Sequence, residues 1–164
     1  LLSKTGYKLC RNNSYSGSTI CNTGYGGQDY SRRSFIARMD DLGNPDIILI
    51  FGATNDCWAG SPIGEYKYDH FTRHDLYTFR PAMAHMLNHM TLRYPNTRIV
   101  FILNDCLTDD INESVQTICK RYGVPVIALH DIAKSDGHPD INGMKNIAEQ
   151  VEKGLKKSTT KSKK

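Results

Sequence analysis

Two polar segments of this sequence carry side chains suited to acyl-transfer chemistry. Residues 52–56 (Gly-Ala-Thr-Asn-Asp) follow an apolar run, and the side-chain amide of Asn55 is a donor that could stabilise a developing oxyanion. Residues 135–139 (Ser-Asp-Gly-His-Pro) contain His138, which could act as a general base because an unperturbed imidazole has a pKa of about 6.5. Asp136 could orient the imidazole through its second nitrogen. Each segment, taken alone, fits an ordinary turn equally well.

A third polar segment, residues 12–19 (Asn-Asn-Ser-Tyr-Ser-Gly-Ser-Thr), offers a backbone donor. If a strand precedes it, Gly17 can direct its N–H group toward a substrate oxygen. By composition alone this segment is only a loop. Its serines, Ser14, Ser16 and Ser18, lack the strand-to-helix elbow that exposes a nucleophile, so packing within a polar loop is the better interpretation.

Two other kinds of site are weaker candidates. Cys57 could be a thiol nucleophile, but no base and orienting group accompany it in order. Two histidine pairs have the i,i+4 spacing that can seat a metal on a helix: His70 with His74, and His85 with His89. No H-E-x-x-H pattern and no third ligand accompany them, so helix-surface positions are the better interpretation. The five cysteines are an odd number without a CxxC pair, so neither a zinc site nor a small disulfide scaffold is indicated.

The elements that must position these residues follow from the hydrophobic pattern. Continuous apolar runs predict strands buried on both faces at residues 46–51, 98–103 and 125–129, and a short strand is expected at residues 7–12. Apolar residues at helical spacing predict helices over residues 31–42, about 76–90, 108–123 and a last helix up to residue 155, for which Asn142 is the expected N-cap. Leu1–Lys4 (residues 1–4) could end a further helix.

Alternating strands and helices predict a parallel sheet covered on both faces. In such sheets, the loops after the carboxyl ends of the strands build the functional site. The loops to search are therefore residues 12–29, 52–73, 104–108 and 130–143, and they include the three polar segments.

Together, the three segments resemble the SGNH (GDSL-type) hydrolase family over about residues 1–152. Residues 13–19 resemble its second block, residues 52–56 its third with one extra residue between Gly and Asn, and residues 136–139 its fifth. A bacterial branch is the most similar, because Trp-Ala-Gly-Ser-Pro follows the third block at residues 58–62. The resemblance implies a three-layer α/β/α sandwich with a flavodoxin-like parallel sheet. It also implies that Gly17 and Asn55 are oxyanion donors and that His138 is the base.

The sequence departs from the family pattern in two places. No Gly-Asp-Ser occurs in the chain, so the family's first strand and its nucleophilic serine are missing and are expected upstream of Leu1. The family's usual fifth block is Asp-x-x-His, whereas Ser135 stands three residues before His138. Asp136 is the candidate acid, and a dyad that uses a backbone carbonyl is the alternative. In the long loop 53–73, Trp58 and Tyr66 would shape the substrate pocket.

For the complete protein, the resemblance implies hydrolysis of an acyl ester or a carbohydrate O-acetyl ester through a Ser-His acyl-enzyme. This reaction needs no cofactor and no metal, so neither is expected. We expect this chain alone to be inactive. The expected partners are a small-molecule ester and either a separate amino-terminal segment that carries the serine or a second copy of the chain. The hydrolase-like domain would span residues 1–155, with a disordered basic tail at 156–164.

Charge and hydropathy exclude two other classes of partner. The formal net charge is +4, and removing the six charges of the lysines that follow Glu152 leaves −2 for residues 1–152, so no nucleic acid is expected as a ligand. No apolar run approaches the roughly 20 residues of a membrane span. Two alternatives remain: a non-catalytic binding or structural module of the same fold, which the missing serine favours, and a flavodoxin-like nucleotide binder. No Gly-rich phosphate loop supports the latter.

Overall fold

The core of the protein is a three-stranded parallel sheet. The structure is a computed structural model and describes residues 7–160, with side chains through residue 156. Strands β1 (Ile47–Gly52), β2 (Arg98–Leu103) and β3 (Val126–Ala128) lie in the order β1-β2-β3. The register pairs Ile47 with Arg98 and Phe101 with Val126. The three apolar runs therefore form the predicted strands, but only β2 is buried on both faces. Strands β1 and β3 lie at the edges of this sheet, where Phe51 is 41% exposed and no residue of β3 is fully buried. The helix end expected at residues 1–4 lies outside the described residues.

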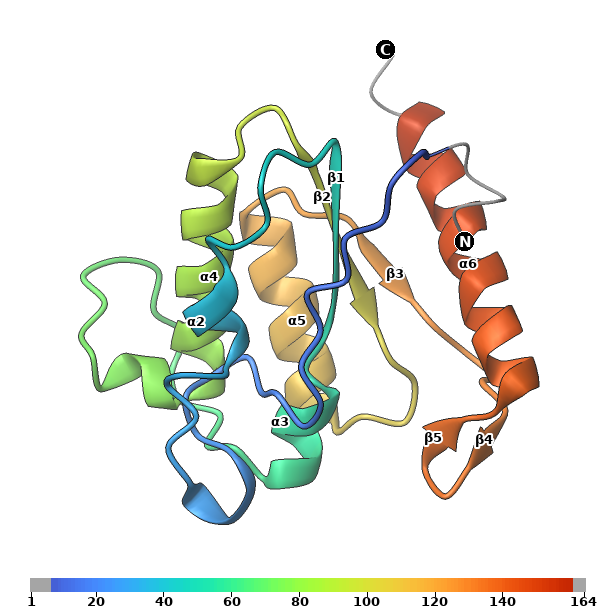
Figure 1. Ribbon diagram of the computed structural model, residues 1–164. Coiled ribbons are helices and arrows are strands. Elements are labelled where there is room, and N and C mark those ends of the chain that lie inside the picture. Colours follow the sequence, from blue (N-terminus) through green and yellow to red (C-terminus); the bar gives the residue numbers. More distant parts are fainter. Residues whose placement is uncertain (1–6, 161–164) are drawn as a thin grey trace.

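Helices cover both faces of this sheet (Figure 1). Helices α4 (Phe79–Arg93) and α5 (Asp109–Arg121) pack on one face, and α6 (Ile141–Thr160) packs on the other. Alternate strand residues supply the two cores: Ile48 and Ile50 join the α4–α5 cluster, while Val100 and Ile102 pack with residues of α6. The predicted three-layer α/β/α sandwich is therefore confirmed. No helix within residues 7–160 is long and apolar enough to cross a membrane.

The shorter elements differ from the sequence prediction. Helix α2 (Phe35–Arg38) is much shorter than the predicted helix at 31–42, and α3 (Thr54–Ala59) lies where a loop was expected. Strands β4 (Lys134–Ser135) and β5 (His138–Pro139) form a small hairpin, and 3-10 turns lie at Tyr25–Gly27 and Asp75–Tyr77.

The last helix starts earlier and ends later than the sequence indicates. Helix α6 starts at Ile141, and the Asp140 carboxylate accepts a hydrogen bond from Gly143 N at 2.8 Å. Asp140 therefore occupies the capping position that we expected for Asn142, which is itself helical, so that prediction is wrong. The helix continues to Thr160, into the segment for which a disordered tail was expected.

The strand predicted at residues 7–12 is absent. Residues 7–16 run along the open side of β1 without regular structure, and the Leu9 side chain is 84% exposed (Figure 1). A strand needs a neighbour with which to exchange backbone hydrogen bonds. A cavity of about 790 Å³ separates this segment from β1, so no ladder forms and the prediction is wrong. Within the described residues, β1 is hydrogen-bonded to β2 alone.

Candidate active site

A sharp turn at the carboxyl end of β1 places Asn55 at the sheet edge. The strand ends at Gly52, and Ala53 then adopts a left-handed conformation (φ 72°, ψ −19°) before α3 starts at Thr54. Such a backbone conformation is uncommon for a residue with a Cβ atom and occurs often at functional sites. A Cβ on Gly52 would lie 3.2 Å from the Ile20 side chain, so this turn packs closely against the loop of residues 12–29, here called the first polar loop.

Two hydrogen bonds fix the amide of Asn55. Its Nδ2 donates to the Ser18 carbonyl oxygen at 3.0 Å, and its Oδ1 accepts from the Tyr25 hydroxyl at 2.8 Å. Ser18 follows Gly17, whose φ of 72° belongs to the turn that residues 15–18 form. Within the described residues, the Gly17 N–H donates no hydrogen bond. The structure thus brings Asn55 next to the turn that contains Gly17.

Asp56, a residue of α3, connects this helix to the first polar loop. Its side chain is only 1% exposed, and its carboxylate accepts hydrogen bonds from Ile20 N at 2.8 Å and Cys21 N at 3.1 Å. Burial raises the pKa of Asp56 to about 6, and the hydrogen bonds from the two backbone N–H groups act in the opposite direction. Asp56 therefore holds the first polar loop on α3.

His138 reaches α3 through Trp58. It lies in β5, after a tight turn in which Asp136 and Gly137 have φ of 50° and 78°. The His138 and Trp58 rings meet edge-to-face, with centroids 5.5 Å apart and an interplanar angle of 78°. Trp58 lies about one turn of helix after Asn55, so the histidine is brought to the helix that carries the candidate oxyanion donor.

Asp136 is near His138 in sequence but does not contact its ring. Asp136 occupies the hairpin turn and is exposed, and among residues 7–156 no hydrogen bond joins its carboxylate to His138. In the described part of the chain, the imidazole is therefore not held by a hydrogen bond to Asp136.

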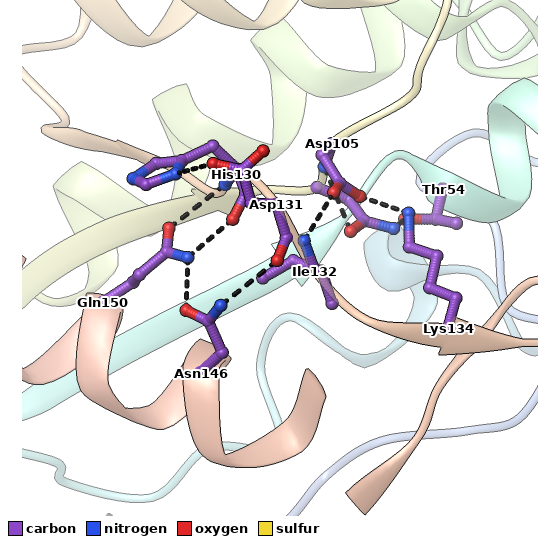
Figure 2. Close-up of polar contacts among 9 residues, drawn as sticks. Thr54, Asp105, His130, Asp131, Ile132, Lys134, Asn146 and Gln150 are labelled. Carbon is purple, nitrogen blue, oxygen red and sulfur yellow. Dashed lines mark hydrogen bonds and ion pairs between the residues drawn. The ribbon is translucent and has the colours of Figure 1, made fainter. Parts of the chain in front are cut away.

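The segment that leads to His138 is held by polar side chains on two sides (Figure 2). From α6, Gln150 donates to the His130 carbonyl oxygen at 2.7 Å and Asn146 donates to the Asp131 carbonyl oxygen at 3.1 Å. From the end of β2, Asp105 accepts from Ile132 N at 3.1 Å and contacts the Lys134 ammonium.

Tyr66 lies apart from these residues. Its ring stacks on Tyr68, with centroids 6.3 Å apart, and the Arg80 guanidinium lies 4.3 Å from its ring centroid. Its hydroxyl is buried without a hydrogen-bond partner in the described part of the chain. Tyr66 thus packs on α4, while Trp58 is the aromatic residue that meets the histidine.

The other weak candidates have ordinary surroundings. His89 Nε2 lies 2.7 Å from the Asp40 carboxylate, and the His85 ring packs edge-to-face on Phe71. Among the described residues, no group of three or more His, Cys, Asp or Glu side chains could hold a metal ion. The Cys57 thiol lies 4.0 Å from the Thr108 hydroxyl, and no base is hydrogen-bonded to it within residues 7–156.

Two cavities lie along the open side of β1. The larger, of about 790 Å³, is lined by β1 residues 47–51, by Met86 and Met90 of α4, and by Leu155 of α6. The smaller, of about 100 Å³, lies at the carboxyl end of β1 and is lined by Gly52, Asn55 and residues of the first polar loop. Ser14, Phe35 and Phe51 line both, so the larger cavity leads to the side chain of Asn55.

Two contacts of the site were not predicted from the sequence. Tyr25 lies in a Gly-rich segment whose composition indicates only a loop, so nothing local identifies it as the partner of Asn55. Asp105 lies in the loop 104–108, after the carboxyl end of a predicted strand. Its partners are distant in sequence, so no local pattern indicates its contacts.

Comparisons with known proteins agree with this architecture. A GDSL-like lipase described from Bacteroides ovatus is 60% identical, with a TM-score of 0.93 over 95% of this chain and 75% of its own. One from Bacteroides uniformis is 51% identical, with a TM-score of 0.93 over 94% of this chain and 73% of its own. A family two carbohydrate esterase from Clostridium thermocellum, in complex with cellohexaose, shares the fold at 16% identity, with a TM-score of 0.55 over 88% of this chain and 48% of its own. No curated protein matches significantly.

The sequence matches the family described as GDSL-like Lipase/Acylhydrolase over residues 1–155. This match covers the sheet, the helices on both of its faces, and every candidate site residue named above. The chain therefore belongs to the GDSL-like lipase/acylhydrolase family of hydrolases.

Proposed function

We propose that this chain supplies the base and the oxyanion donors of a serine esterase whose nucleophile enters along β1. The observation that carries the proposal is the continuity of the two cavities. A strand laid parallel to β1 in the 790 Å³ cavity would end at the 100 Å³ hollow beside Asn55. Residues from both helical layers line the larger cavity, as they would line a strand of this sheet.

In the proposed reaction, the serine oxygen attacks the ester carbonyl while His138 takes the serine proton. The carbonyl oxygen becomes an oxyanion, which the Asn55 amide and the Gly17 N–H stabilise. His138 then gives its proton to the departing alkoxide, leaving an acyl-enzyme. Water repeats the sequence with the same base and releases the carboxylic acid. The Asn55 amide has two hydrogens, and one is used by Ser18, so the other can serve the oxyanion.

The group that orients His138 is a separate proposal. We retain Asp136 as the orienting carboxylate, and a dyad with a backbone carbonyl is the alternative. Asp136→Ala separates them. It should reduce kcat by roughly 10⁴-fold if the carboxylate orients the correct imidazole tautomer, as loss of the triad acid does elsewhere. If a backbone carbonyl orients His138 instead, the same substitution should reduce kcat much less.

The proposed substrates are acyl esters, including carbohydrate O-acetyl esters. Trp58 is 44% exposed beside His138 and offers an apolar ring face at the site. The Clostridium thermocellum esterase of the same fold is described with a bound cello-oligosaccharide, which supports sugar esters as a class to assay. Tyr66 is left out of the proposed pocket because it packs on α4.

The test of the proposed function uses the complete protein, including the residues upstream of Leu1. Turnover of p-nitrophenyl acetate should be almost abolished by His138→Ala. The matched control is His130→Ala, because His130 lies in the same segment and its side chain is 74% exposed. Near-normal turnover by the His138 variant would reject His138 as the base.

The second candidate function is a non-catalytic binding module of the same fold. The absence of Gly-Asp-Ser from the chain favours it. If the complete protein binds an acetylated oligosaccharide, retains it unhydrolysed, and has no Gly-Asp-Ser upstream, this second function holds and the esterase proposal fails.

A further inference from the structure

We propose that Asp105 is a positioning residue that sets the distance between the base His138 and the oxyanion donor Asn55. The proposal rests on the proposed function, which gives these two residues their roles. Asp105 follows β2, the strand that lies between the strands leading to each of them. It touches neither residue directly.

On one side, Asp105 holds the hairpin of His138. Its Oδ2 accepts from Ile132 N at 3.1 Å, and its Oδ1 contacts the Lys134 ammonium. Lys134 is the first residue of β4, and the next residue, Ser135, pairs with His138 across the hairpin. One carboxylate thus fixes two points of the chain just before the histidine (Figure 2).

On the other side, the neighbouring residue holds the start of α3. Asn104 donates from Nδ2 to the Thr54 hydroxyl at 3.2 Å, and its Oδ1 accepts from Asp105 N at 3.1 Å. Thr54 directly precedes Asn55. The dipeptide at the end of β2 therefore connects the helix of the oxyanion donor to the hairpin of the base.

The ion pair is sheltered enough to have a defined geometry. The side chains of Asp105 and Lys134 are 15% and 21% exposed. Partial burial opposes ionisation of Asp105, but hydrogen bonds from Lys134 and Ile132 outweigh it and lower the pKa of the carboxyl below its ordinary value. An ion pair of this kind is more sensitive to loss of one partner than an exposed pair, because the remaining charge is left poorly solvated.

The contacts from α6 do not replace this anchor. Gln150 and Asn146 hold the carbonyl oxygens of His130 and Asp131, at the start of the segment. The hairpin is closed at its base, next to α6, by a hydrogen bond from Asp140 N to the Ala133 carbonyl oxygen at 3.1 Å. On the side of β2 and α3 it is held by Asp105 through Lys134 and by the ring contact with Trp58. Loss of Asp105 should therefore release the hairpin from β2 while its base stays on α6.

Trp58 reports this placement without any assay of activity. It is the only tryptophan of the 164-residue chain, and its ring contacts that of His138. A protonated imidazole quenches the fluorescence of an indole that it contacts, so the Trp58 emission should be lower in acid than at neutral pH while the two rings are in contact. His138→Gln should abolish this change, which assigns it to His138.

Asp105→Ala should reduce the amplitude of this pH-dependent emission change at least threefold. Asp105→Asn should restore part of it, because the asparagine oxygen can still accept from Ile132 N. The matched control is Asp131→Ala, which removes a 91% exposed carboxylate from the same segment and should leave the amplitude unchanged. If Asp105→Ala does not fold, Lys134→Met removes the other partner and should give the same loss. Wild-type amplitude in either variant that folds overturns the proposal.

A kinetic measurement on the complete protein separates this inference from the proposed function. Asp105→Ala should lower kcat by roughly 100-fold with little change in KM, because a displacement of about 1 Å at the reacting groups has an effect of this size. If the emission change is lost but turnover proves independent of His138, the proposed function fails and the placement by Asp105 stands. If kcat falls while the emission change is intact, the positioning role is wrong.

Discussion

At the scale of single residues, Asn55 has partners that define where its free hydrogen points. Because Ser18 and Tyr25 engage the two ends of the amide, the group cannot rotate without losing both hydrogen bonds. A donor held in this way needs no reorganisation when charge develops on the substrate, which is the condition for effective oxyanion stabilisation.

Asn55→Ala should therefore lower kcat by roughly 100- to 1000-fold in the complete protein, with a smaller effect on KM. Tyr25→Phe removes only the hydroxyl that fixes the amide at 2.8 Å, and it should cost no more than about tenfold, the equivalent of one ordinary hydrogen bond. Steady-state kinetics with p-nitrophenyl acetate measure both. An equal decrease in kcat in the two variants would mean that Asn55 supports the local structure and does not stabilise the oxyanion.

The sequence identified the candidate residues through local motifs, but not their contacts. Asn55 and His138 lie in short polar segments after apolar runs, and such segments can be recognised without a structure. Their partners Tyr25 and Trp58 are joined to them across loops whose paths depend on tertiary packing. The orientation of Tyr66 toward α4 could not be predicted for the same reason.

At the scale of elements, Asp56 makes the contact between the first polar loop and α3 sensitive to pH. Its folded-state pKa of about 6 lies above the usual value for an unfolded chain, about 3.9. The folded protein therefore binds the proton more tightly than the unfolded protein. This contribution to stability is complete below about pH 4 and is lost as pH rises toward 6.

The free energy of unfolding in urea should thus decrease by roughly 2 kcal/mol from this group between pH 4 and 6. Asp56→Asn should flatten that part of the profile, although the variant is less stable throughout, because its amide N–H₂ group lacks an acceptor. Asp46→Asn, at an exposed carboxyl, is the control and should keep the wild-type slope. An unchanged slope in Asp56→Asn would contradict the raised pKa.

Helix α6 packs so closely on the segment before His138 that there is no room for a side chain at Gly143. A Cβ on this residue would lie 2.1 Å from the Ala133 carbonyl oxygen, a backbone atom that cannot move independently. Gly143→Ala gains about 1 kcal/mol of helix propensity. The clash should outweigh this gain, so we expect a net loss of about 1–3 kcal/mol, as for other overpacked sites.

Thermal unfolding and amide exchange of residues 130–134 measure this effect. Asn142→Ala, one residue earlier on the exposed side of α6, is the control and should leave both unchanged within experimental error. A Gly143→Ala variant more stable than wild type would show that α6 can move away from Ala133 at little cost.

The elements that the sequence predicted are those with a strong local pattern. The three strands are continuous apolar runs, and α4, α5 and α6 have apolar residues at helical spacing. Helix α3 has no such period and depends on the left-handed turn at Ala53, so it was missed. The strand at residues 7–12 was wrongly predicted because a strand depends on a neighbour that sequence pattern does not reveal.

At the scale of the whole molecule, the open side of β1 is the principal irregularity. Within the described residues, β1 has a hydrogen-bonded neighbour on one side only, and the 790 Å³ cavity lies on the other. Apolar side chains from α4 and α6 face this cavity, including Met86, Met90 and Leu155. An additional parallel strand would satisfy the edge of β1 and fill the space that these side chains line.

We therefore expect residues 1–164 alone to lack esterase activity and to exchange the β1 amides faster than those of β2. Supplying the upstream segment, in the same chain or as a separate peptide, should protect the β1 amides and raise the melting temperature, because a ligand that binds only the folded state stabilises it. Size-exclusion chromatography tests the alternative: protection of β1 in a dimer without the segment would assign the cavity to a second copy. A monomer of residues 1–164 that already hydrolyses p-nitrophenyl acetate would refute the proposed entry of the serine along β1. The nucleophile would then have to be sought among Ser14, Ser16, Ser18 and Cys57, and substitution of each by alanine would identify it.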